Sequence, residues 1–171
     1  MLTNIIENSA TLLDKAMTVV DQLLKELDAE ATALQEHYYA KKDVLYRGEL
    51  RKLEQVLDDA DKALRRAYAP LNFSARVDDV RLDMFWWTRH RRPNGGAVLK
   101  HRVPWGAAKR KAHHGYYVPI LLKEAKQWEV DLVKGVETHA VTLREARAML
   151  LEFKTKIGVY RRLLNRTMDP S

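Results

Sequence analysis

The chain has 171 residues, of which 30 are Lys or Arg and 23 are Asp or Glu, so its net charge is +7. It has no cysteine, which excludes a disulfide framework and a thiolate metal site or nucleophile, and its length suits one domain over residues 1–171. The first residues lack the pattern of a signal peptide, and no segment reaches the ~20 apolar residues that span a bilayer, so we expect a cytoplasmic protein with no membrane partner.

The first third of the chain has the pattern of a long amphipathic helix. Apolar residues recur at alternating steps of four and three, as in a coiled coil, at Val20, Leu24, Leu27, Ala31, Leu34, Tyr38 and Leu45, apart from one seam position that Lys41 occupies. A similar series continues from Leu50 to Tyr68, but the step that contains Gly48 is five residues long. We therefore predict one helix over residues 5–68 with a kink or short break near Gly48, ended by Pro70.

The middle of the chain, residues 69–118, has the pattern of a β-hairpin head. Apolar residues alternate with mixed and then basic residues from Val80 onward, which is the period of a strand. Turn residues follow at 92–96, and residues 98–103 can return as a second strand. If the apolar side packs on the helices, the outward side carries Trp87, Arg89, Arg91, Lys100 and Arg102.

The same stretch concentrates the positive charge. Residues 84–123 hold nine Lys or Arg and four His but no Asp or Glu, and such a focused field favours nucleic acid. A two-stranded ribbon fits the major groove of duplex DNA, and the small-residue loop at 107–115 suits phosphate contacts. The sequence therefore predicts a DNA-binding site made of Trp87, Arg89, His90, Arg91, Arg92, Lys100, Arg102, Lys109, Arg110, Lys111 and His114.

The last third repeats the helical pattern. Pro119 suits the first turn of a helix, and apolar residues follow near heptad spacing from Ala125 to Leu164, which predicts a helix over residues 119–167. Two long helices joined by about 50 residues pair most simply antiparallel. We therefore predict a mainly α fold with a small β insertion, in which two long antiparallel helices form a coiled-coil-like stalk or bundle joined by the basic hairpin.

Other functions leave few signals in the sequence. It has no zinc-protease helix motif, phosphate-binding glycine loop, dinucleotide fingerprint or elbow serine, so we expect neither an enzyme nor a cofactor. The adjacent His113 and His114 project differently and have no carboxylate nearby in the sequence, so we expect no metal. Three alternatives stay open: a single-stranded nucleic-acid binder that stacks Trp87 and Trp105 on bases, a coiled-coil adaptor that binds a protein, and a solvated loop with core aromatics.

The start of the last helix resembles a known family. The residues that carry the likeness are Ala125-Lys126-Gln127-Trp128-Glu129, Leu132-Val133, Glu137 and Arg144. This pattern resembles that of MobI-type conjugative transfer proteins. Other landmarks fall in the same order over residues 35–165, namely Tyr38-Tyr39, Trp86-Trp87-Thr88-Arg89 and the basic passage from Lys109 to Tyr117.

The resemblance implies an accessory factor that recognises the origin of transfer of a conjugative element and helps the relaxase to act there, without cutting DNA itself. The relaxase or another relaxosome protein would then be a partner, and a second copy of the chain is a further candidate. Because Trp128, Glu129, Glu137 and Arg144 follow the basic stretch, we expect structural roles for them. Trp128 would lie in the helix seam, and the charged residues would brace the head on the helices.

Overall fold

The chain divides into two compact units. The computed structural model describes residues 2–77, 82–90, 99–104 and 114–168. One unit consists of Met1–Ala29 with Glu145–Ser171 and the other of Glu30–Arg144. We call them the terminal unit and the central unit. The prediction of one domain over 1–171 is not tested by this division and stays a prediction.

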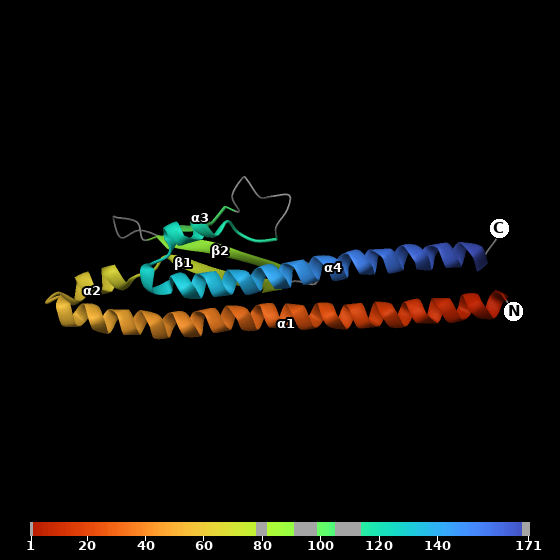
Figure 1. The fold of residues 1–171 in the computed structure, drawn as a ribbon, viewed down its shortest axis with the longest axis horizontal. Helices are drawn as coiled ribbons and strands as arrows, with labels where there is room; N and C mark the ends of the chain where they lie inside the picture. Colours follow the sequence, from red (N-terminus) through yellow and green to blue (C-terminus); the bar gives the residue numbers. More distant parts are fainter. Residues whose placement is uncertain (1, 78–81, 91–98, 105–113, 169–171) are drawn as a thin grey trace. The chain divides into compact units, whose positions relative to one another are not determined.

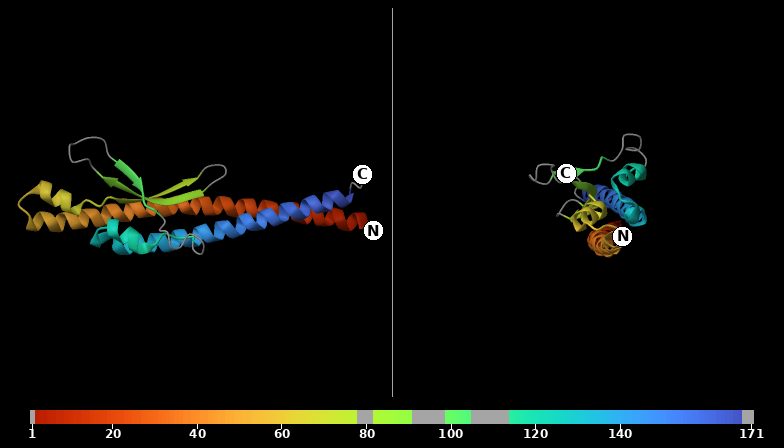
Figure 2. Two further views of the ribbon diagram at one scale, coloured as in Figure 1. Left: turned by 90° about the horizontal axis from the view of Figure 1, so that it is seen from above. Right: turned by 90° about the vertical axis from the view of Figure 1, so that its left-hand side faces the viewer.

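The central unit combines helices with a small sheet (Figures 1 and 2). Its elements in chain order are the later part of α1 (Leu2–Val56), α2 (Ala60–Ala67), β1 (Leu71–Val77), β2 (Leu82–His90), β3 (Leu99–Arg102), α3 (Val118–Glu124), the 3₁₀ helix η2 (Gln127–Glu129) and the first part of α4 (Val130–Met168). The strands form an antiparallel sheet in the order β1-β2-β3. Leu71 of β1 lies opposite Thr88, and Trp87 of β2 lies opposite Arg102 of β3.

One face of the sheet packs on the helices through an aromatic cluster. Phe73, Met84 and Trp86 are buried on this face, and the ring centroids of Phe73 and Trp86 are 5.1 Å apart. Tyr38 of α1 lies edge-on to Trp86 at 5.4 Å, and its hydroxyl donates a hydrogen bond to the carbonyl of Leu71 at 2.9 Å. Such edge-to-face pairs add to the free energy gained by burying the rings. The sheet is therefore fixed to α1 at the start of β1.

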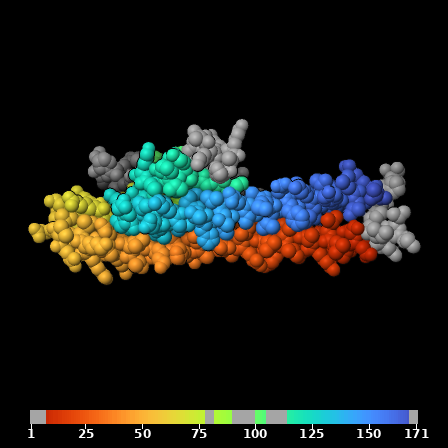
Figure 3. All heavy atoms as spheres, viewed as in Figure 1, coloured from red at the N-terminus to blue at the C-terminus, as the bar shows by residue number. Residues whose placement is uncertain are grey.

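The terminal unit is a pair of antiparallel helical segments, the first part of α1 and the last part of α4, which lie side by side (Figure 3). Three ion pairs join them at steps of seven residues: Asp14–Arg161 at 3.3 Å, Asp21–Lys154 at 2.6 Å and Asp28–Arg147 at 3.2 Å. The numbers rise along one segment as they fall along the other, so the segments run antiparallel. Val20, Leu24 and Ile157 form the buried centre of this unit.

The fold class is confirmed as mainly α with a small β insertion. Of the predicted kink or short break near Gly48, the break is wrong, and the kink stays a prediction. α1 continues through Gly48 and ends at Val56, because one exposed glycine costs a helix only about 1 kcal/mol. The interruption comes at residues 57–59 instead. Asp59 caps α2 there by accepting hydrogen bonds from the backbone of Asp61 and Lys62, and this satisfies donors that a helix start leaves free.

Two further boundaries differ from the predictions. The helix predicted over 119–167 does begin with Pro119 in its first turn, but it is interrupted between Glu124 and Val130. Lys126 is extended there, because its backbone N–H donates to the buried carboxylate of Glu129 at 3.0 Å. The predicted hairpin of β2 and β3 is present, but the sheet has a third strand, β1, that the sequence analysis missed.

Among the described residues, no helix is long and apolar enough to cross a membrane.

Candidate nucleic-acid interface

The outer face of the sheet, which is turned away from the aromatic cluster, carries cations and aromatic rings. Strand alternation and register place nine side chains on this face: Asn72, Ser74, Arg76, Asp83, Phe85, Trp87, Arg89, Lys100 and Arg102. Trp87 donates its indole N–H to the hydroxyl of Ser74 at 2.9 Å. Arg89 and Lys100 lie directly opposite each other on neighbouring strands. This pairing of like charges is destabilising in the absence of a counter-charge.

Cations cover the aromatic rings of the outer face. The guanidinium carbons of Arg102 and Arg76 lie 4.4 and 5.1 Å from the ring centroid of Phe85. Phe85 is consequently only 8% exposed although it lies on the outer face. The ammonium of Lys100 lies 5.1 Å from the ring centroid of Trp87. Cation–π contacts of this kind hold the charged groups at fixed positions over the sheet.

Arg102 is the most constrained cation of this face. Its guanidinium donates to Asp83 at 2.6 Å across the sheet. Burial alone would lower the pKa of Arg102, but hydrogen bonds with Asp83 and Tyr116 together with their charges raise its pKa above the ordinary value. Asp83 therefore neutralises Arg102, and the positive charge of the face comes from Arg76, Arg89 and Lys100.

Four of the predicted DNA-binding residues, Trp87, Arg89, Lys100 and Arg102, lie together on the outer face. His90 is the last residue of β2 and pairs with Leu99 in the ladder. His114 is exposed in the segment before α3 and is not part of the sheet. The remaining predicted residues, Arg91, Arg92, Lys109, Arg110 and Lys111, lie outside the described residues, as do the turn at 92–96, Trp105 and His113.

Arg76 is the cation of the outer face that the sequence analysis missed. It lies on β1, where buried Leu71 and Phe73 alternate with more exposed Asn72 and Ser74. This period of two is typical of a half-buried strand and could have predicted β1. Its signal is short, because residues 71–77 directly follow α2 and Pro70.

A buried ion pair of α4, which we call the Glu137–Arg144 brace, fixes β2 to the helix. The carboxylate of Glu137 is 2% exposed and accepts hydrogen bonds from the indole N–H of Trp86 at 2.7 Å, the backbone of Tyr116 at 2.6 Å and Arg144 at 3.0 Å. Arg144 also donates to the carbonyls of Met84 at 3.1 Å and His114 at 3.0 Å. The predicted bracing role of these two residues is confirmed.

A second buried pair joins α1 to the residues before α4. The ammonium of Lys42 lies 3.6 Å from the carboxylate of Glu129, and it donates to the carbonyls of Ala69, at 3.3 Å, and Leu71. Burial raises the pKa of Glu129 and lowers the pKa of Lys42, and the attraction between the two charges partly offsets both shifts. The neighbouring Trp128 lies against α1, with its ring centroid 6.3 Å from that of Tyr46.

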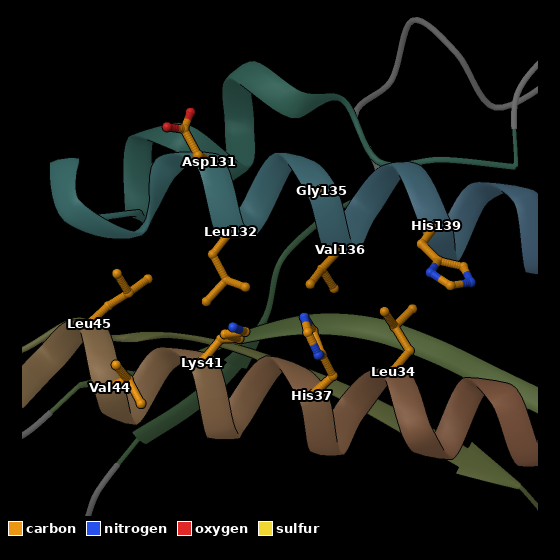
Figure 4. A pocket seen from close by; sticks show the side chains of 10 residues that line it. All are labelled: Leu34, His37, Lys41, Val44, Leu45, Asp131, Leu132, Gly135, Val136 and His139. Carbon is orange, nitrogen blue, oxygen red and sulfur yellow. The ribbon is translucent and has the colours of Figure 1, made fainter.

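α1 and α4 leave a groove of about 490 Å³ between them in the central unit (Figure 4). Side chains of Leu34, Leu132 and Val136 point into it, whereas Asp131 points away. His139 also lines this groove, and its Nε2 lies 2.9 Å from Oε1 of Glu30. Over the described part of the chain, no group of three His, Asp or Glu side chains could hold a metal ion. Besides the apolar side chains and His139, the groove is also lined by His37 and Lys41.

Comparison with known proteins yields one finding. No curated protein and no solved structure matches the chain. A family model described as "MobI protein" matches residues 12–158. The match includes the whole sheet and the Glu137–Arg144 brace, and it covers most of the 171 residues. The chain therefore belongs to the MobI family, which points to an accessory role in conjugative transfer.

Proposed function

We propose that this protein is a non-enzymatic accessory factor of conjugative transfer that binds double-stranded DNA at the origin of transfer and assists the relaxase there. Membership of the MobI family supports a role in conjugative transfer. One observation above all supports DNA as the ligand: Arg89 of β2 lies directly opposite Lys100 of β3. Two like charges held directly opposite each other cost free energy, and a phosphate group placed between them would remove that cost.

The outer face suits a duplex better than a single strand. Single-stranded nucleic acid binds mainly by stacking bases on accessible aromatic rings. Here Lys100 lies over the ring of Trp87, the indole N–H of Trp87 is held by Ser74, and two guanidinium groups cover Phe85. The rings thus serve to position cations. A narrow antiparallel sheet with cations on its outer face can enter a major groove and contact its phosphates and base edges.

The first test is a titration of the full chain by fluorescence anisotropy against three labelled DNAs. These are the origin-of-transfer duplex of the element that encodes the chain, a scrambled duplex of equal length, and the origin sequence as a single strand. If roughly four to six cations contact phosphates, the slope of log affinity against log salt is about −4 to −5. A slope near zero, or equal affinity for single strand and duplex, would contradict the proposal.

Variants then locate the interface. Arg89→Ala and Lys100→Ala should each weaken duplex binding and reduce the salt slope by about one. The matched control is Lys134→Ala, which removes an exposed cation from α4 and should leave affinity unchanged. A loss of about 1–3 kcal/mol on the origin duplex, with little loss on the scrambled one, would indicate that Arg89 contacts a base. Equal losses for Lys134→Ala and the two sheet variants would exclude the outer face as the binding site.

A further inference from the structure

The terminal unit carries a second apolar stripe on each of its helices, and its own packing leaves these stripes exposed. The residues are Leu12, Val19 and Leu23 on α1 and Met149, Phe153, Tyr160 and Leu163 on α4, with exposures of 40 to 71%. These residues have the spacing of coiled-coil contact positions. Successive members are seven and four residues apart on α1, and four, seven and three residues apart on α4. Each helix segment is therefore apolar on two sides, although the unit itself uses only one of them.

The two exposed stripes lie on the same face of the unit. The three ion pairs fix one side of the helix pair, because Asp14 and Asp21 reach Arg161 and Lys154 there. Residues two positions apart on a helix point in nearly opposite directions, about 200° apart. Leu12 and Val19 lie two positions before Asp14 and Asp21, and Met149 and Leu163 lie two positions after Arg147 and Arg161. Leu12, Val19, Met149 and Leu163 therefore lie opposite the ion pairs. Tyr160 is one position before Arg161 and three before Leu163, so it lies about 100° from the ion pairs and about 60° from Leu163, and Phe153 lies in the same direction as Tyr160. We call this surface the apolar face.

The apolar face has the size of a protein interface. Seven side chains that each expose on the order of 100 Å² give roughly 700 Å², close to the ~800 Å² that each partner buries in a standard interface. A monomer rarely exposes so large an apolar patch. Charges of both signs border and interrupt it: Lys15 and Glu26 are exposed on α1, and on α4 Lys156, which lies seven residues from both Met149 and Leu163, pairs with Glu152 at 2.7 Å. The surroundings of the face thus attract neither a polyanion nor a strongly basic partner.

We propose that the apolar face binds the same face of a second copy of the chain, so that two terminal units form a four-helix bundle. A two-fold contact brings identical surfaces together, and heptad spacing on both helices lets their side chains interdigitate in layers. Rim charges of both signs allow Lys side chains of one copy to lie near Glu side chains of the other. The buried centre of the isolated unit consists of Val20, Leu24 and Ile157, so a second copy adds most of the core of the bundle.

The test is light scattering coupled to size-exclusion chromatography on the full chain without DNA, so that its result does not depend on the proposed DNA binding. At micromolar concentration the mass should be twice that of one chain. Val19→Glu and Tyr160→Glu should each raise the dimer dissociation constant by at least about tenfold, because each would place a charge in the apolar contact. Both side chains are exposed within one chain, so circular dichroism should show unchanged helix content.

Leu151→Glu is the matched control. Leu151 is 39% exposed and lies two positions after Met149, so it points away from the apolar face. This variant should remain dimeric. A monomeric wild-type chain would overturn the proposal, and so would dimers of Val19→Glu and Tyr160→Glu as tight as the wild type. Equal dissociation of Leu151→Glu would also overturn it, because the contact would then not involve the apolar face specifically.

Discussion

Replacement of Glu137 by Ala should destabilise the central unit strongly. The substitution removes the acceptor of three hydrogen bonds, from Trp86, Tyr116 and Arg144. Removing one partner of a buried ion pair typically costs 3–5 kcal/mol, so we expect a loss of about 4 kcal/mol in the free energy of unfolding. Glu137→Gln keeps the shape and one carbonyl oxygen but presents an N–H₂ group to donors, so we expect a loss of about 1–3 kcal/mol.

Urea unfolding measures these losses. Tryptophan fluorescence responds to the site, because the indole of Trp86 is one of the donors, and far-ultraviolet circular dichroism responds to the helices. Glu145→Gln is the control, since it changes an exposed carboxylate on the same helix and should alter stability by no more than about 0.5 kcal/mol. One ordinary hydrogen bond contributes roughly 1 kcal/mol. A free energy of unfolding of Glu137→Ala within about 1 kcal/mol of the wild-type value would mean that the brace does not hold the sheet.

Two glycines and one buried carboxylate give further predictions. Gly48→Ala should stabilise α1 by about 1 kcal/mol, because among the described residues nothing outside its chain neighbours and the surrounding helix backbone lies within 4 Å of the added Cβ. Gly115→Ala should cost about 1–3 kcal/mol, because its Cβ would lie 2.5 Å from Val141 Cγ2. Thermal unfolding of both variants would show opposite shifts, and equal shifts would contradict this account. Burial raises the pKa of Glu129 above 4.5, so between that pH and the raised value the folded state binds more protons than the unfolded state. Wild-type stability should therefore fall relative to that of Glu129→Gln as pH rises from 4.5 towards neutrality, and urea midpoints that run parallel over this range would refute the shift.

The faces of β2 and β3 could be predicted because a strand has only two sides. Once Met84 and Trp86 are assigned to the core, the period of two places Trp87 and Arg89 on the other side. The same argument places Lys100 and Arg102 on that side of β3. Helix pairing was predictable for a similar reason, since the stripe through Val20 and Leu24 specifies which side of α1 is buried.

Boundaries and buried charges could not be predicted, because they depend on partners far away in the sequence. Glu129 looks like an ordinary helix-surface residue until Lys42 is placed beside it, and α4 begins only after it, at Val130. Phe85 would be exposed on an outward face if Arg76 of β1 and Arg102 of β3 did not cover it. The helix is interrupted at residues 57–59 rather than near Gly48, because the Asp59 cap outweighs a small difference in propensity.

The Glu137–Arg144 brace connects the residues that carry the family resemblance with the proposed DNA-binding face. Glu137 holds the indole of Trp86, and Arg144 holds the carbonyl of Met84. Successive side chains of a strand point to opposite faces, so fixing Met84 and Trp86 on the inner side also fixes Phe85 and the residues that follow on the outer side. The buried charges of α4 thus position cations that they never touch. A Glu137→Gln chain that stays folded should accordingly bind duplex DNA more weakly with an unchanged salt slope, because it would lose alignment and keep every phosphate contact.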